Sequence, residues 1–187
     1  MNRVSILDYS ALGVVSWRLK PYHNLHYVVN AREHDCIENI FERVVERTKI
    51  LNGKKFTDLH IYAHGRGIYI EDELAQMSHK IRGFGMKLGG GKLDLSNLYL
   101  ANVLKDHFEQ IVLYNCGVAQ TAPGYEGTTG DGQRFCGELA IRTNTEVIAS
   151  SEVQWYKVVD GVIDNGAWEG TVYKFSPIDG SSSIVYK

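Results

Sequence analysis

The sequence predicts an α/β domain whose central sheet is mostly parallel and is covered by helices on both faces. Apolar runs of strand length alternate with segments of helical periodicity between residues 25 and 150. In the run at 110–114, Ile111, Val112 and Leu113 are unbroken, as is typical of a parallel strand that is buried on both faces. The chain has 187 residues, 44% apolar and 22% charged, which suits one domain with its own hydrophobic core.

The expected elements follow one another in a regular order. Strands are expected at 25–29, 57–63, 110–114 and 146–149, and helices at 33–50, 94–107 and 132–143. The helix over 33–50 has the clearest pattern, because Ile37, Ile40, Phe41 and Val44 fall on one face. Residues 71–94 contain Gly83, Gly85 and the run Gly89–Gly91, which indicates a flexible connection or a small excursion. The first 22 residues show only a weak pattern.

The pattern changes to β-hairpins after residue 154. Short apolar runs are separated by turn sequences at 160–161, 164–166 and 179–180. We therefore expect a single domain over 1–187, with a core at about 25–155 and a hairpin extension at about 156–187.

Composition and charge exclude several classes of protein. The formal net charge of -2 gives no basic surface for nucleic acid. No apolar run reaches the roughly 18 residues that a membrane span needs. Asp8 interrupts the first apolar run, so a signal peptide is not expected, and the protein is expected in the cytoplasm as synthesised. Export without a cleaved signal peptide stays an open alternative.

Two reactive side chains follow the expected second and third strands. His64 comes directly after Leu-His-Ile-Tyr-Ala, and Cys116 directly after Ile-Val-Leu-Tyr-Asn. Neighbouring parallel strands lie roughly 5 Å apart, so a histidine and a cysteine at matching ends can form a catalytic pair. Glycine follows each of them, and the backbone N–H groups of Gly65 and Cys116 could form an oxyanion hole. The other cysteines fall in expected helices and are not expected to be catalytic: Cys136 is expected in the core, and Cys36 in the core or partly exposed.

The order strand-His-Gly and then strand-x-Cys-Gly, with 52 residues from His64 to Cys116, resembles the caspase-like (clan CD) cysteine peptidases. The motif Tyr-Asn-Cys-Gly-Val-Ala lacks the Gln-Ala-Cys of true caspases and is more similar to bacterial caspase-like domains. The stretch 135–150 also resembles the helix and strand that follow the nucleophile in that family. The resemblance covers about residues 25–155.

The resemblance implies a caspase-like three-layer sandwich and a peptidase that acts on proteins or peptides. It implies catalysis by His64 and Cys116, with a substrate cleft lined by Ser150, Ser151 and Trp155. It implies no metal and no organic cofactor. An amidase or transpeptidase that uses the same pair, and a non-catalytic binding module, remain as alternatives. The residue preference and the oligomeric state are not predicted.

The segment 120–132 follows Cys116 closely and is rich in glycine and threonine. It is expected to be a mobile loop at the border of the site, with Tyr125 as its one large anchor.

Overall fold

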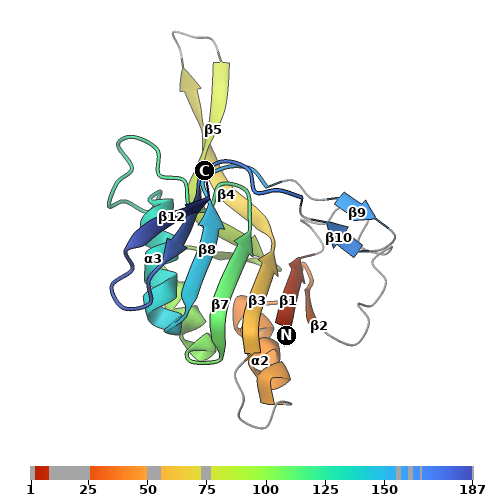
Figure 1. The fold of residues 1–187 in the computed structure, drawn as a ribbon. Helices are drawn as coiled ribbons and strands as arrows, with labels where there is room; N and C mark the ends of the chain where they lie inside the picture. Colours follow the sequence, from red (N-terminus) through yellow and green to blue (C-terminus); the bar gives the residue numbers. More distant parts are fainter. Residues whose placement is uncertain are drawn as a thin grey trace.

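The computed structural model describes residues 3–8, 26–49, 56–72, 77–154, 157–159, 162–164 and 166–186. Its main feature is a seven-stranded sheet with the strand order β12-β11-β8-β7-β3-β1-β2 (Figure 1). The strands are β1 (Arg3–Asp8), β2 (His26–Ala31), β3 (Phe56–Tyr62), β7 (Phe108–Tyr114), β8 (Glu146–Ser150), β11 (Val172–Phe175) and β12 (Ser182–Tyr186). Strands β2, β1, β3, β7 and β8 are parallel, and β11 pairs antiparallel with both β8 and β12.

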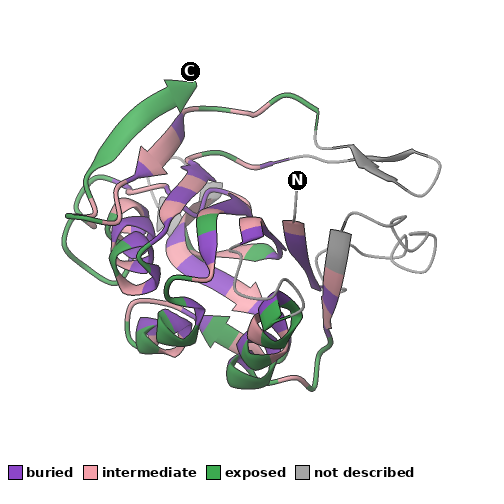
Figure 2. Cartoon of the chain, turned by 60° about the horizontal axis from the view of Figure 1, so that its bottom comes forward, coloured by how far each residue is buried: buried purple, intermediate pink, exposed green. Residues whose placement is uncertain are grey.

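Three helices pack on one face of this sheet: α2 (Ile37–Thr48), the 3-10 helix η3 (Leu98–Leu104) and α3 (Gly132–Thr143). Their apolar sides share a single core with the alternate side chains of the strands (Figure 2). The largest fully buried side chains of this core include Phe41, Phe56, Phe108, Phe135, Ile61 and Leu59. The expected cover of helices on both faces is therefore not met in the described residues, whose helices all lie on one face.

Local signals explain the bounds of the two α-helices. Asp131 caps α3, since its carboxylate accepts the N–H of Arg134, and Asn144 ends the helix in a left-handed conformation with φ of 49°. Helix α2 has Glu38 in its first turn and Arg47 in its last, which suits the helix dipole. The expected helices at 33–50 and 132–143 are thus confirmed.

A second, antiparallel sheet follows His64. It consists of β4 (His64–Asp72), β5 (Met77–Leu88) and β6 (Gly91–Leu93). The β4–β5 hairpin projects beyond the carboxyl ends of the main strands (Figure 1). Of the two alternatives expected for 71–94, the described part forms a small excursion and not a flexible connection, because the glycines there allow backbones to approach closely.

The glycine run between β5 and β6 is a packed turn. Gly89 is buried with φ of 59°, and a Cβ added there would lie 2.7 Å from the carbonyl oxygen of Asp35. Its N–H donates to Asp8 Oδ2 at 2.8 Å, and the N–H of Gly90 donates to Asp35 O at 3.0 Å. The turn therefore joins the end of β1 to the segment before α2.

The expected strands at 25–29, 57–63, 110–114 and 146–149 correspond to β2, β3, β7 and β8. Strand β1 was not expected, yet it lies between β2 and β3 inside the sheet. The expected helix over 94–107 is reduced to the short η3. Of the expected hairpin extension, only β9 (Lys157–Val159) and β10 (Val162–Asp164) form a separate pair, while β11 and β12 extend the main sheet.

No helix in the described ranges is long and apolar enough to cross a membrane.

The packing of the glycine turn can be tested with Gly89→Ala. We expect a loss of about 2–4 kcal/mol in unfolding free energy, because the new methyl group adds a clash to an unfavourable φ. Gly127→Ala is the matched control, since Gly127 also has positive φ but would place its Cβ in open space; it should lose about 1–2 kcal/mol. Urea denaturation measures both, and equal losses would show that the turn is not packed.

Candidate active site

His64 and Cys116 lie at matching positions after two neighbouring strands. Strands β3 and β7 are paired in parallel, and Tyr62 is opposite Tyr114 at the end of their register. His64 and Cys116 each follow two residues later. The His64 side chain is exposed and Cys116 is half-buried, so both can be reached from solvent. The expectation that the two strands are neighbours is confirmed.

The backbone of Gly65 lies directly against that of Cys116. A Cβ added at Gly65 would overlap the Cys116 carbonyl oxygen and would lie 2.8 Å from the carbonyl carbon and 3.0 Å from the nitrogen. No side chain fits between these two segments, which is why glycine follows His64. The contact holds the backbone that directly follows His64 against the backbone of Cys116.

A side-chain hydrogen bond joins the same two segments one residue earlier. Asn115 is fully buried, and its Nδ2 donates to the carbonyl oxygen of Ala63 at 3.0 Å. Ala63 immediately precedes His64, and Asn115 immediately precedes Cys116. This bond continues the link between β3 and β7 beyond the last paired residues.

The third strand end, that of β8, contacts the cysteine segment through its backbone. Gly117 has φ of 57°, and its N–H donates to Glu152 O at 2.8 Å. The N–H of Ala119 donates to Ser150 O at 3.1 Å. Because the Gly117 amide is already bonded, it is a poor candidate for an oxyanion hole, and the Gly65 and Cys116 amides stay the predicted donors.

The side chains predicted to line a substrate cleft do not all suit that role. Ser150 is fully buried; its hydroxyl donates to Glu169 O at 2.5 Å and accepts the Glu152 N–H. The prediction for Ser150 is therefore wrong, since a buried and bonded hydroxyl offers no surface to a substrate. Ser151 is half-buried beside Gly117, with its hydroxyl 3.4 Å from Thr171 O. Trp155 lies outside the described residues.

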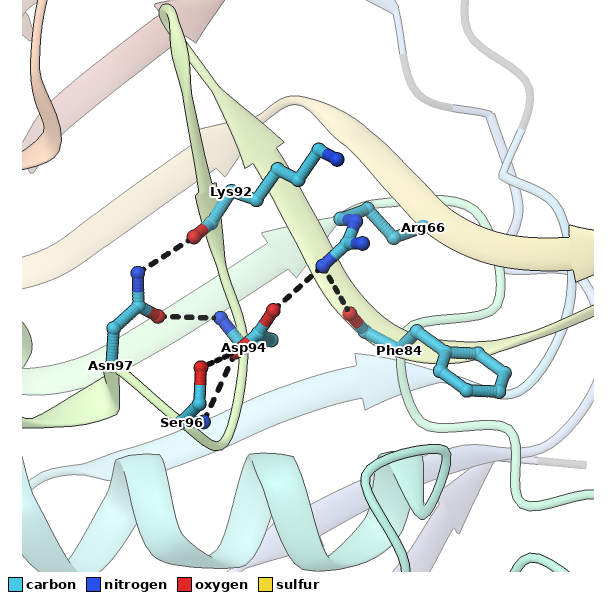
Figure 3. Close-up of polar contacts among 6 residues, drawn as sticks. All are labelled: Arg66, Phe84, Lys92, Asp94, Ser96 and Asn97. Atoms are coloured by element: carbon cyan, nitrogen blue, oxygen red, sulfur yellow. Dashed lines mark hydrogen bonds and ion pairs between the residues drawn. The ribbon is translucent and has the colours of Figure 1, made fainter.

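An ion pair fixes β4 immediately after the histidine. Arg66 Nη1 lies 2.7 Å from Asp94 Oδ2 and 3.4 Å from the carbonyl oxygen of Phe84 (Figure 3). Burial alone would raise the pKa of Asp94, but hydrogen bonds from the Ser96 hydroxyl and N–H, together with Arg66, outweigh it and lower the pKa. Asp94 is thus held ionised, and it ties β4 to the turn that precedes η3.

Arg82, on β5, differs from Arg66 in having no ion-pair partner among the described residues. Its side chain crosses Gly117, because a Cβ added at that glycine would lie 2.7 Å from Arg82 Cδ. Its Nε is buried without a hydrogen-bond partner in the described part of the chain. Its backbone N–H is held by Gln120 Oε1 at 2.8 Å. An unpaired, half-buried cation therefore lies beside the cysteine segment.

The loop 120–132 is closed by its own hydrogen bonds. Asp131 accepts from the Gly127 N–H, the Arg134 N–H and the Thr121 hydroxyl. Burial would raise the pKa of Asp131, but these three bonds and the charge of Arg134 lower it. Tyr125 packs edge-on against Phe84 with ring centroids 5.5 Å apart. The loop thus has the expected anchor, but its many internal bonds favour one conformation over the mobile loop expected from composition.

A stack of aromatic rings lies on the strands just before the two reactive residues. Tyr62 and Tyr114 stack with centroids 4.7 Å apart, and Trp168 stacks on Tyr114 at 5.1 Å. His60 lies 5.3 Å from the Tyr114 ring. Because side chains alternate along a strand, this stack lies on the sheet face opposite the helices. It stiffens the strand ends that position His64 and Cys116.

The remaining cysteines differ sharply from Cys116. Cys136 is fully buried in α3, where burial and, to a smaller extent, the charge of Asp131 raise the pKa of its thiol. Cys36 is exposed at the residue that precedes α2. Of the two expectations for Cys36, a core or a partly exposed position, the core position is wrong. Across the described ranges, no three His, Cys, Asp or Glu side chains cluster as ligands for a metal ion.

Searches against protein-family models, curated proteins and solved structures find no match for this chain.

Sequence reasoning found His64, Gly65 and Cys116 but missed Asn115, Arg82 and Trp168. Asn115 had a local signal, since a polar residue stands between an apolar strand and the candidate nucleophile. Arg82 and Trp168 had none, because they reach the site only through pairing of distant segments.

The contrast between the two arginines gives a stability prediction. Arg66→Met should lower the melting temperature by about 2–4 °C, because it leaves Asp94 without its cation, at a cost of about 1 kcal/mol. Arg82→Met should leave the melting temperature unchanged or raise it, because a half-buried charge without a partner costs free energy. Calorimetry of both variants checks this, and a lower value for Arg82→Met would reveal a partner for that guanidinium.

The three thiols should differ in their reactivity toward an alkylating reagent in the native protein at neutral pH. Cys116 and Cys36 should react with iodoacetamide, because both are reachable. Cys136 should stay unmodified, since a raised pKa keeps it in the unreactive thiol form and burial denies access. Peptide mass mapping before and after urea unfolding measures this; modification of native Cys136 would contradict the buried position.

Proposed function

We propose that the protein is a caspase-like cysteine peptidase that uses His64 and Cys116 as a catalytic pair. The single observation in support is the contact of the Gly65 and Cys116 backbones at the ends of two adjacent parallel strands. The sheet order, with five parallel strands and an antiparallel edge, is compatible with the caspase-like sandwich. Strand ends on one edge of such a sheet are where ligands bind in open α/β folds.

The reaction follows acyl-transfer chemistry. The Cys116 thiolate attacks the carbonyl carbon of a peptide bond and forms a tetrahedral intermediate. The N–H groups of Gly65 and Cys116 stabilise its oxyanion, and His64 protonates the departing amine. A thioester remains on Cys116, and water hydrolyses it to release the acid and restore the thiol.

The substrate is a protein or a peptide, and the reaction needs no metal or organic cofactor. The segment after β8 borders the nucleophile through its backbone, because Glu152 O binds the Gly117 N–H. A peptide in extended conformation could pair along such a segment, with its scissile bond over Cys116.

A peptide-library cleavage profile tests the proposal, with Cys116→Ala as the blank. Cys116→Ala and His64→Ala should each abolish cleavage, lowering kcat/KM by at least about 10³-fold, because the thiolate and its proton donor act as a unit. Cys36→Ser should keep the parent rate. Cleavage by Cys116→Ala at the parent rate would contradict the assignment.

A further inference from the structure

We propose that Asn115 is a positioning residue that sets the separation of His64 and Cys116. The inference rests on the proposed function, because it assigns a role only within that catalytic pair. Asn115 does not touch a substrate in this role; it acts through the peptide group that precedes His64.

The geometry of the amide supports this role. Asn115 Nδ2 donates to the Ala63 carbonyl oxygen at 3.0 Å. That carbonyl and the N–H of His64 belong to one planar peptide group, so a fixed carbonyl also fixes the direction in which the chain enters His64. The donor is on the residue bonded directly to Cys116. One hydrogen bond therefore links the segment that precedes the proposed proton donor His64 to the segment of the proposed nucleophile Cys116.

A second contact completes a clamp with this bond. Gly65 packs against the Cys116 backbone on the far side of His64. His64 is thus held from both sides, by Asn115 through Ala63 and by Cys116 through Gly65. His64 is exposed, and these two contacts fix the backbone from which its side chain projects.

The burial of Asn115 is unusual for a merely structural residue. Its side chain is fully buried, and Oδ1 has no hydrogen-bond partner in the described part of the chain. An unsatisfied buried acceptor costs free energy, and an apolar side chain would avoid that cost. The bond from Nδ2 to the Ala63 carbonyl oxygen offsets part of this cost, and an apolar side chain could not make it.

The test measures how strongly His64 maintains the Cys116 thiolate. Cys116 alkylation by iodoacetamide is followed at pH 6 and pH 9 in a Cys36→Ser background, which removes the other exposed thiol. A thiol with an ordinary pKa of about 8.5 is about 0.3% ionised at pH 6, so a paired thiolate reacts far faster there. At pH 9 an ordinary thiol is itself mostly ionised, so a paired and an unpaired cysteine react at similar rates. The ratio of the two rates therefore reports the pairing.

Asn115→Ala should lower the pH 6 rate by about tenfold or more and bring it close to that of His64→Ala, while the pH 9 rate stays within about twofold. Asn115→Ser gives a second variant in case the alanine variant does not fold; its shorter hydroxyl cannot span to Ala63 O, so the ratio should fall likewise. The charge of Arg82, which also lies beside Gly117, is common to all variants.

Thr145→Val is the matched control. Thr145 is also buried and joins neighbouring strands, because its hydroxyl donates to Phe108 O at 3.2 Å, but it lies at the amino end of β8. It should lower the melting temperature and leave the pH 6 to pH 9 ratio unchanged. A structural role alone would make Asn115→Ala behave like this control.

The outcomes separate the two proposals. If the parent and His64→Ala share one low ratio, the catalytic pair itself is refuted, and the role of Asn115 with it. If the parent ratio is high and Asn115→Ala keeps it, the pair stands and the positioning role is overturned. A high parent ratio that falls in both Asn115 variants but not in Thr145→Val supports the inference.

Discussion

The site depends on the close approach of two backbones, those of Gly65 and Cys116. Strand pairing alone brings β3 and β7 to the usual spacing, but the chain then leaves both strands, and pairing no longer constrains it. The absence of a side chain at residue 65 lets the two segments stay in contact beyond the sheet. Three further contacts involve the residues next to it in the chain: Asn115 bonds to Ala63, Glu152 bonds to Gly117, and the Arg82 side chain packs against Gly117.

Much of the fold could be predicted because its signals are local. Strand β7 contains the apolar run Ile111–Leu113, β3 is rich in apolar and aromatic residues, and α3 has a capping aspartate at its start and an asparagine at its end. The order of elements then placed His64 and Cys116 at neighbouring strand ends. Strand β1 was missed, although its six residues include Val4 and Ile6 in the core, because the sequence of the first 22 residues has only a weak pattern.

The remaining details depend on contacts between distant segments. The glycines of 83–91 predict flexibility when they are read alone, and only the partners Asp8 and Asp35 show that the turn is packed. Ser150 is an error of another kind. It was expected to line a cleft, but its hydroxyl bonds to the carbonyl oxygen of Glu169, a residue far along the chain, and its side chain is buried. Composition likewise could not show that Asp131 organises the loop 120–132.

The outer edge of β12 has a consequence for handling the protein. All five residues of this strand are exposed, Ile184, Val185 and Tyr186 among them, and no described strand pairs with its free side (Figure 2). Unpaired N–H and C=O groups beside apolar side chains form a template on which another extended chain can add. Concentrated samples should therefore tend to associate edge to edge. A lysine in place of Ile184 would oppose this, because a charge on an edge strand disfavours such pairing.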